Sequence, residues 1–289
     1  MPVISIGNLT VGGSGKTPLA AEIARMMLDM GERPAILSRG YARKVPSDGV
    51  VLVSDGTRVL SDVEHAGDEP FMLTQMVPRA AVLVSANRYL AGKVAEARLG
   101  CTVHILDDGF QHFDLMRDVD LLVMPAILDD VRTLPAGRYR EPLDAALAAD
   151  AFLVEGAAGA ADPRGVQAGS PIFEFERRLA GSPSHQPAFA FAGIARPHRF
   201  YEDLQRAGWN LTGYRWFRDH HRYSRRDVET VAQAARASGA EVMVTTAKDG
   251  VRLPPGDAGT PVVVVPMELS IEPRFRGWLA ERLKDARSA

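Results

Sequence analysis

The chain has 289 residues, of which 46% are hydrophobic and 24% charged, and its formal net charge is −2. This composition is that of a folded globular protein and excludes a disordered or fibrous chain, while the length predicts two domains. The near balance of charge gives no electrostatic reason to expect a nucleic-acid partner, and nothing in the composition implies a protein partner.

Cys101 is the only cysteine, which excludes an internal disulfide and a metal site built from cysteines. It precedes an apolar run at residues 103–106, which predicts a buried strand and a packing role for the thiol. No apolar stretch approaches the roughly 18–20 residues that span a bilayer, and no charged-then-apolar leader precedes the first strand. We therefore expect neither secretion nor a membrane-spanning helix.

Short apolar runs alternate with longer helical patterns through the first half of the chain. Strands are expected at residues 3–6, 34–37, 80–84, 102–106 and 119–124, and helices at residues 18–30 and 87–99. This alternation predicts an α/β fold with a doubly wound, mostly parallel sheet. The glycine-rich segment 12–17, between the first expected strand and the first expected helix, makes that fold P-loop NTPase-like. Ligands of such folds bind beyond the carboxyl ends of the strands.

A second, smaller α/β domain is expected after a junction rich in small residues. Residues 156–169 are rich in Ala and Gly, and the segment 181–184 reads Gly-Ser-Pro-Ser. Beyond it, strands are expected at 188–192, 211–217, 242–245 and 262–265, and helices at 197–207, at 225–238 and from 273. The predicted domains are residues 1–182, which contain the glycine-rich segment, and residues 183–289.

A nucleotide phosphate loop follows the first predicted strand and opens the first predicted helix. It reads Gly12-Gly13-Ser14-Gly15-Lys16-Thr17. The glycines allow backbone N–H groups to surround phosphate oxygens, Lys16 supplies a charge for the β and γ phosphates, and the Thr17 hydroxyl can bind Mg²⁺. Thr10 stands where the usual pattern has its first glycine.

Phosphoryl transfer also needs a carboxylate for the metal, generally at the end of a neighbouring apolar strand. Asp107 ends the run at 102–106 and is the expected Mg²⁺-associated carboxylate, with Asp108 as a second candidate for metal or substrate. Guanine specificity commonly uses Asn-Lys-x-Asp at a strand end, and residues 246–249 lack that pattern. We therefore expect ATP, rather than GTP, with Mg²⁺.

Several short motifs, taken in order, resemble the tetraacyldisaccharide 4'-kinase family of lipid A biosynthesis. They are the segments 7–18, 38–41, 67–70, 107–112, 134–137, 140–142, 219–220 and 245–249. The family's loop likewise carries Thr at the position of Thr10. The resemblance implies transfer of the ATP γ-phosphate to the 4'-hydroxyl of a tetraacylated glucosamine disaccharide 1-phosphate, at the cytosolic face of the bacterial inner membrane.

The resemblance also suggests catalytic roles. A sugar hydroxyl is a poor nucleophile, so a carboxylate that accepts its proton is expected. The sequence alone predicts that Asp68 is a helix N-cap. The resemblance instead implies that Asp68 forms a catalytic dyad with a histidine, and His220 is the residue that matches that histidine. His221 is the neighbouring competitor for that role. Glu69 either assists the metal or simply favours the first turn of a helix.

Three basic or acidic residues beyond the dyad are further candidates. Arg140, in a loop before an expected helix near residue 142, would stabilise charge on the γ-phosphate or hold the 1-phosphate of the substrate. Lys248 and Asp249 follow a predicted strand and would contact the nucleotide, Asp249 through the adenosine. Residues 245–250 also fit an ordinary strand-to-helix cap.

The acylated substrate stays in a bilayer, so peripheral membrane contact is expected. Family members carry an apolar, partly basic stretch before the phosphate loop, which does not occur in these 289 residues. Either a segment lies upstream, or another element such as the helix at 18–30 touches the membrane. Two other functions remain open at this point, a P-loop kinase of a soluble small molecule and a nucleotide-switched accessory ATPase.

Overall fold

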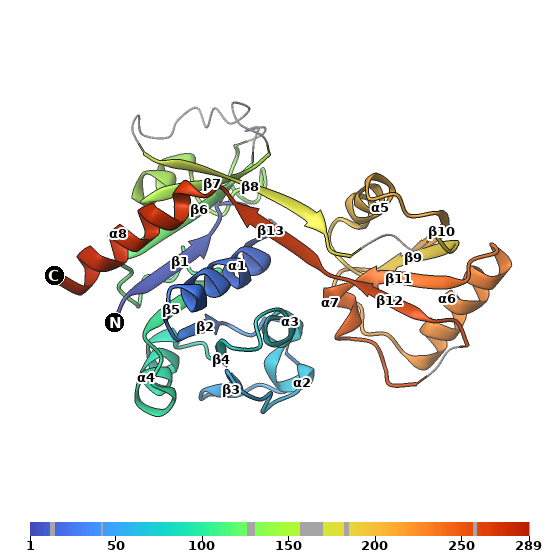
Figure 1. Cartoon of the computed structure of the whole chain (residues 1–289), viewed down its shortest axis with the longest axis horizontal. Coiled ribbons are helices and arrows are strands. Elements are labelled where there is room, and N and C mark those ends of the chain that lie inside the picture. The colour runs from blue at the N-terminus through green and yellow to red at the C-terminus, as the bar shows by residue number, and fades with distance from the viewer. Residues whose placement is uncertain are drawn as a thin grey trace. The chain divides into compact units, whose positions relative to one another are not determined.

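A computed structural model describes residues 1–11, 15–41, 43–125, 131–156, 170–181, 185–256 and 259–288. The chain forms two compact units. The first comprises Met1–Arg177 and Leu269–Ala289, and the second comprises Arg178–Glu268 (Figure 1).

A nine-stranded sheet forms the centre of the first unit. Its order is β13 (Met267–Ile271), β8 (Ile172–Leu179), β7 (Ala151–Glu155), β6 (Val119–Met124), β1 (Val3–Gly7), β5 (Val103–Asp107), β2 (Pro34–Ser38), β4 (Ala81–Val84) and β3 (Val51–Asp55). All neighbours from β8 to β4 pair in parallel, and β3 is antiparallel to β4. The order places β1 at a reversal of winding, where ligands of such sheets bind.

Helices cover both faces of this sheet. α1 (Lys16–Asp29), α3 (Asp68–Met76) and α8 (Arg274–Ser288) share one apolar core with the strands, whereas α4 (Arg88–Leu99) belongs to another. Ile4 lies in the first core and its neighbour Val3 in the second, because successive strand residues point to opposite faces. The predicted doubly wound α/β fold is confirmed. Two short helices, α2 (Val63–Ala66) and the 3-10 helix η1 (Leu143–Ala148), complete the unit.

The C-terminal helix belongs to the first unit, which differs from the expected division into 1–182 and 183–289. Strand β13 returns the chain to the edge of the large sheet, and α8 then packs on that sheet. Phe275, Leu279 and Leu283 recur at helical spacing and are buried, and the Phe275 ring meets Phe173 of β8 edge-on at 5.1 Å. Burial of these three apolar side chains explains why the C-terminal segment packs on the first unit.

The second unit is a parallel four-stranded sheet covered by helices. Its order is β10 (Leu211–Trp216), β9 (Ala188–Ala192), β11 (Val242–Thr246) and β12 (Val262–Val265), and its helices are α5 (Pro197–Arg206), α6 (Arg225–Ala237) and α7 (Ala247–Gly250). The alanines of β9 pack with α5, and the phenylalanines between them pack with α6. The smaller α/β arrangement expected here is therefore present.

Cys101 has the packing role that its sequence context predicts. It is buried among the apolar side chains around α4, and burial raises the pKa of its thiol to about 11, so that it stays protonated.

A helix long and apolar enough to cross a bilayer does not occur within the described ranges.

Candidate active site

The central residues of the site come together because β1 and β5 are adjacent parallel strands. Their register pairs Ile6 with Asp107, so both strands end at the same edge of the sheet. The phosphate loop leaves β1 at that edge and the acidic pair leaves β5. Gly7 permits this approach, since a Cβ at this position would lie 2.3 Å from Cβ of Phe110.

Lys16, the first residue of α1, is held beside the acidic pair. Its Nζ donates to Oδ1 of Asn8 at 2.8 Å and lies 3.3 Å from Oδ1 of Asp108. Asn8 also donates from Nδ2 to the Thr10 hydroxyl at 3.1 Å. Oxygen atoms of Asn8 and Asp108 therefore orient the ammonium group. Gly12, Gly13 and Ser14 lie outside the described residues, and Gly15 is the N-cap of α1 with φ 80°.

The Thr17 hydroxyl donates to the Asp107 carboxylate, at 3.2 and 3.4 Å from its two oxygens. Burial, followed by the negative charges of Glu69 and Asp108, raises the pKa of Asp107 to about 7, while Lys16 and Thr17 lower it. A buried carboxylate that disfavours its own charge is well placed to gain from a divalent cation.

The donor set fits Mg²⁺. The ion prefers oxygen ligands and in nucleotide sites is usually held by one or two protein groups together with phosphates. Thr17 and Asp107 supply such a pair. A group of three or more His, Cys, Asp or Glu side chains that could hold a metal does not occur in the described part of the chain. The structure therefore does not assemble Asp107, Asp108 and Glu69 into one cage.

Asp108 links two cations. It has a left-handed φ of 56°, and its carboxylate pairs with Lys16 and, at 3.1 Å, with Nη1 of Arg140. The Arg140 backbone N–H donates to the Leu9 carbonyl at 2.6 Å, and its Nη1 donates to Oε1 of Gln111 at 3.4 Å. The loop that carries Arg140 is thus attached to the start of the phosphate loop, which places the guanidinium beside Lys16.

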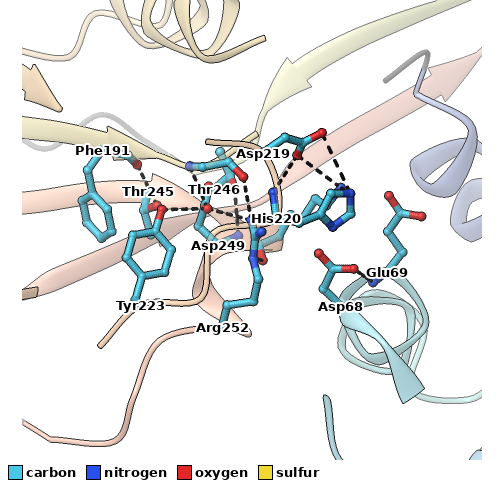
Figure 2. Close-up of polar contacts among 12 residues, drawn as sticks. Asp68, Glu69, Phe191, Asp219, His220, Tyr223, Thr245, Thr246, Asp249 and Arg252 are labelled. Carbon is cyan, nitrogen blue, oxygen red and sulfur yellow. Dashed lines mark hydrogen bonds and ion pairs between the residues drawn. The ribbon is translucent and has the colours of Figure 1, made fainter. Parts of the chain in front are cut away.

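Asp68 begins α3 and is 5% exposed. Gly67, with φ 91°, occupies the N-cap position, and no side chain caps this helix, so the sequence-based N-cap reading is wrong. The Asp68 Oδ1 accepts the Glu69 N–H at 3.0 Å, as Figure 2 shows at the start of α3. Glu69 raises the pKa of Asp107 through its charge, which places α3 within electrostatic reach of Asp107.

In the second unit, His220 lies in the loop between β10 and α6 with φ 57°. Its N–H is directed toward the Gly193 carbonyl at 3.1 Å and Oδ1 of Asp219 at 2.9 Å. Its Nε2 lies 3.3 Å from Nζ of Lys248. The predicted residues His220 and Lys248 are therefore neighbours.

His221 is engaged differently from His220. Its ring stacks on Phe217 with centroids 4.5 Å apart, and its Nε2 lies 3.3 Å from Oδ2 of Asp227. Asp227 completes the capping box of α6 with Ser224. His221 therefore packs its loop against α6. His220 is the better candidate for the catalytic histidine.

Asp249 is fully buried and surrounded by donors from its own unit. Its Oδ1 accepts hydrogen bonds from the Gly193 N–H, the Tyr223 hydroxyl and Nη2 of Arg252, and its Oδ2 accepts one from the Thr246 hydroxyl. Thr246 is the N-cap of α7. This position does not fit the predicted contact of Asp249 with adenosine; the strand-to-helix cap is what the structure contains.

Comparison with known proteins adds independent findings. Residues 1–284 match the family model described as tetraacyldisaccharide-1-P 4'-kinase. The chain belongs to this family. Its sequence is 39% identical over 278 residues to the tetraacyldisaccharide 4'-kinase of Desulfotalea psychrophila, covering 88% of this chain and 78% of that protein. It is 40% identical over 269 residues to the Geobacter metallireducens enzyme, covering 88% and 79%.

A solved structure supports the same assignment. The family member LpxK from Aquifex aeolicus, described as an apo form in complex with ATP, superposes with a TM-score of 0.79 at 30% identity. The match covers 98% of this chain and 88% of that one. The family resemblance inferred from the ordered motifs is confirmed, and with it the P-loop kinase fold.

Sequence reasoning missed two residues of the site in this family member. Asn8 contacts both Lys16 and Thr10. Its position between the first strand and the glycines is the sequence feature that could have identified it as a site residue. Arg88, at the start of α4, is 6% exposed. Burial, followed by the positive charge of Arg39, lowers the pKa of Arg88, whereas the negative charges of Asp108 and Asp107 raise it. A buried arginine near carboxylates depends on tertiary contacts that sequence alone does not reveal.

The raised pKa of Asp107 leads to a stability prediction. In the unfolded chain its pKa is near 3.8, and in the folded protein about 7. Between these values the folded state binds more protons, so the free energy of unfolding falls as pH rises through that window. We expect Asp107→Asn, in chelator-treated protein, to be more stable than wild type at pH 8, by on the order of 2–4 kcal/mol, and similar to it near pH 4.

Urea unfolding at the two pH values measures this difference. Asp62→Asn is the matched control, because hydrogen bonds from His65 lower the pKa of Asp62, so its substitution should not stabilise the protein at pH 8. An Asp107→Asn variant no more stable than wild type at pH 8 would contradict the argument.

Proposed function

We propose that this protein transfers the γ-phosphate of ATP to the 4'-hydroxyl of a tetraacylated glucosamine disaccharide 1-phosphate. The arrangement of Lys16, Thr17 and Asp107 at the shared edge of β1 and β5 carries the proposal, because it unites the phosphate-binding cation with the metal-binding pair. Membership of the family supplies the identity of the acceptor.

Roles in the first unit follow from these contacts. Thr17 and Asp107 would hold Mg²⁺, which when bound neutralises charge on the β and γ phosphates. Lys16 adds its charge to the same phosphates, with Asn8 and Asp108 fixing the ammonium group. These groups stabilise the charge that develops as the bond between the γ phosphorus and the ADP oxygen breaks.

Asp68 is the proposed general base. Its carboxylate accepts the proton of the 4'-hydroxyl while that oxygen forms its bond to the γ phosphorus. His220 is proposed to pair with Asp68 in the working enzyme, as the family resemblance implies. The engagement of His221 with Phe217 and Asp227 supports His220 over its neighbour. We further propose that the second unit closes over the site during turnover and excludes water, which would otherwise compete for the phosphoryl group.

Arg140 is proposed to act on the γ-phosphate. Its pairing with Asp108, which also pairs with Lys16, supports this role over binding of the 1-phosphate. We expect Arg140→Lys to lower kcat by on the order of 10²-fold, because lysine lacks the forked geometry of the guanidinium. Steady-state kinetics with varied ATP and varied acceptor measure the effect, with the exposed Arg79→Lys as control. A rise confined to the KM of the acceptor would instead assign Arg140 to the 1-phosphate.

Peripheral contact with the cytosolic face of the inner membrane is proposed because four acyl chains keep the acceptor in a bilayer. The first helix does not serve this purpose, since Leu19, Ile23 and Met27 of α1 are fully buried in the core. Phe113 and Met116, in the loop after β5, are 73% and 85% exposed and offer apolar side chains to a membrane surface.

An acceptor series tests the proposed reaction. ATP consumption is measured with acylated disaccharide 1-phosphate in detergent micelles, with its deacylated form, and with no acceptor. The proposal predicts rapid consumption with the acylated acceptor and a phosphorylated lipid as product. Equal rates without acceptor would favour a nucleotide-switched ATPase, and preference for the deacylated sugar would favour a kinase of a soluble molecule.

A further inference from the structure

The Asp249 carboxylate is the centre of a buried polar cluster in the second unit. Asp249 and Arg252 are 0% and 9% exposed, and their ion pair has an Nη2 to Oδ1 distance of 2.7 Å. The Tyr223 hydroxyl donates to the same Oδ1 at 2.8 Å; burial, and then the charge of Asp249, raises its pKa, so it remains a proton donor. Figure 2 shows these contacts converging on one carboxylate.

Buried charge is costly unless it is paired and hydrogen-bonded, and an ion pair of this kind is weak evidence for stability alone. The role of this cluster is therefore better judged from the chain segments that it connects than from its contribution to the free energy of unfolding. Three segments distant in sequence meet here. They are the end of β9 at Gly193, the loop before α6 at Tyr223, and α7 with the residues just after it, at Asp249 and Arg252.

Gly193 connects the cluster directly to His220. Its N–H donates to Asp249 at 2.9 Å, and its carbonyl accepts both Nη2 of Arg252 at 3.0 Å and the His220 N–H at 3.1 Å. A side chain at Gly193 would be tightly packed, because a Cβ there would lie 3.0 Å from Cβ of His221 and 3.2 Å from the Tyr223 hydroxyl. The loop therefore lies directly against Gly193.

The cluster also fixes the turn that carries Lys248. Nε of Arg252 donates to the Lys248 carbonyl at 3.0 Å, and Asp249 is the next residue along the chain. Lys248 Nζ and His220 Nε2, which lie 3.3 Å apart, are thus both carried by backbone that the same three buried side chains hold. The left-handed φ of 57° at His220 requires such restraint, since non-glycine residues rarely adopt it unaided.

We propose that Asp249, with Tyr223 and Arg252, acts as a positioning cluster that sets the orientation of the His220 imidazole and the Lys248 ammonium group for phosphoryl transfer. This inference rests on the proposed role of His220. None of the three side chains has to touch nucleotide or acceptor, which agrees with the complete burial of Asp249.

Tyr223→Phe is the decisive variant, because it removes one hydroxyl and keeps the ring that packs on Phe191 and Phe217. We expect kcat to fall about tenfold, with the KM for ATP unchanged within about twofold. Asp249→Asn weakens the pair with Arg252 and should have a larger effect, about 100-fold, provided that circular dichroism shows a folded protein. Tyr214→Phe, at an exposed position of β10, is the matched control and should retain wild-type kcat.

A double-mutant cycle and a spectroscopic readout separate positioning from general stability. In a His220→Ala background, Tyr223→Phe should cause a smaller loss of kcat than in wild type, because the part of its effect that acts through His220 is already absent. In protein labelled at the histidine Cε1 carbon, Tyr223→Phe should shift the His220 resonance, and Tyr214→Phe should not. An unchanged His220 resonance, or an equal loss of kcat in the His220→Ala background, would overturn the inference.

The two readouts also distinguish this inference from the proposed reaction. If His220→Ala retains full kcat, the role proposed for His220 in catalysis fails. A shifted His220 resonance in Tyr223→Phe would still support the structural part, in which the cluster orients the imidazole.

Discussion

Lys16→Met is expected to lower kcat for phosphorylation of the acylated acceptor by on the order of 10³-fold or more. Methionine keeps the aliphatic stem of this side chain, which is only 10% exposed, and removes the ammonium group. The loss arises because no other group replaces that charge next to the phosphates, and because Asn8 and Asp108 lose their shared partner. Affinity for ATP should fall as well, measured by titration calorimetry with Mg²⁺ present.

Lys93→Met is the control for this substitution. Lys93 lies on α4 and pairs with Glu96 on the same helix, with more than half of its side chain exposed. Its substitution should leave kcat and ATP affinity unchanged. Wild-type ATP affinity and turnover in Lys16→Met would be incompatible with a phosphate-binding role for Lys16.

Asp68→Asn is expected to lower kcat by on the order of 10²–10⁴-fold while ATP binding stays near wild type. Asparagine retains an oxygen that can accept the Glu69 N–H, so the start of α3 should be preserved. What it loses is the ability to take the proton of the attacking hydroxyl. The comparison of kcat with the ATP dissociation constant separates the proposed base from the nucleotide-binding groups.

Asp62→Asn tests whether any carboxylate near these helices has the same effect. Asp62 is the N-cap of α2, where it accepts the N–H groups of Glu64 and His65, and asparagine caps helices equally well. Full activity is expected. A loss of ATP affinity in Asp68→Asn as large as that in Lys16→Met would argue against a role limited to proton transfer.

The nucleotide-binding half could be predicted from sequence because its signals are local. A strand, a glycine-rich turn and a helix follow one another within thirty residues, and Asp107 ends a run of apolar residues on a central strand. Because the carboxyl ends of parallel strands meet at one edge of a sheet, Lys16, Thr17 and Asp107 could be placed together before the pairing register of the strands was known. The observed pairing of Ile6 with Asp107 agrees with that expectation.

The remaining features depend on contacts between distant segments. Strand β13 and helix α8 were assigned to the wrong unit because their partners, β8 and Phe173, lie about a hundred residues earlier. Strands β3 and β7 were missed. β3 is an antiparallel strand at the edge of the sheet, and the helix described between β6 and β7 is the short η1 rather than a long amphipathic one. Asp249 resembled a ligand-binding residue at a strand end; only the fold shows that Tyr223, Arg252 and Gly193 use its oxygens.

We propose that a single triphosphate site formed by Lys16, Thr17 and Asp107 drives phosphorylation of one sugar hydroxyl. This is tested by incubating the protein with Mg-ATP and micellar tetraacyldisaccharide 1-phosphate and locating the new phosphate by phosphorus–proton correlation NMR. We predict one added phosphate, coupled to the proton at the 4' carbon, and none with Lys16→Met. A phosphate at any other position, or ADP formed with no phosphorylated lipid, would contradict the account.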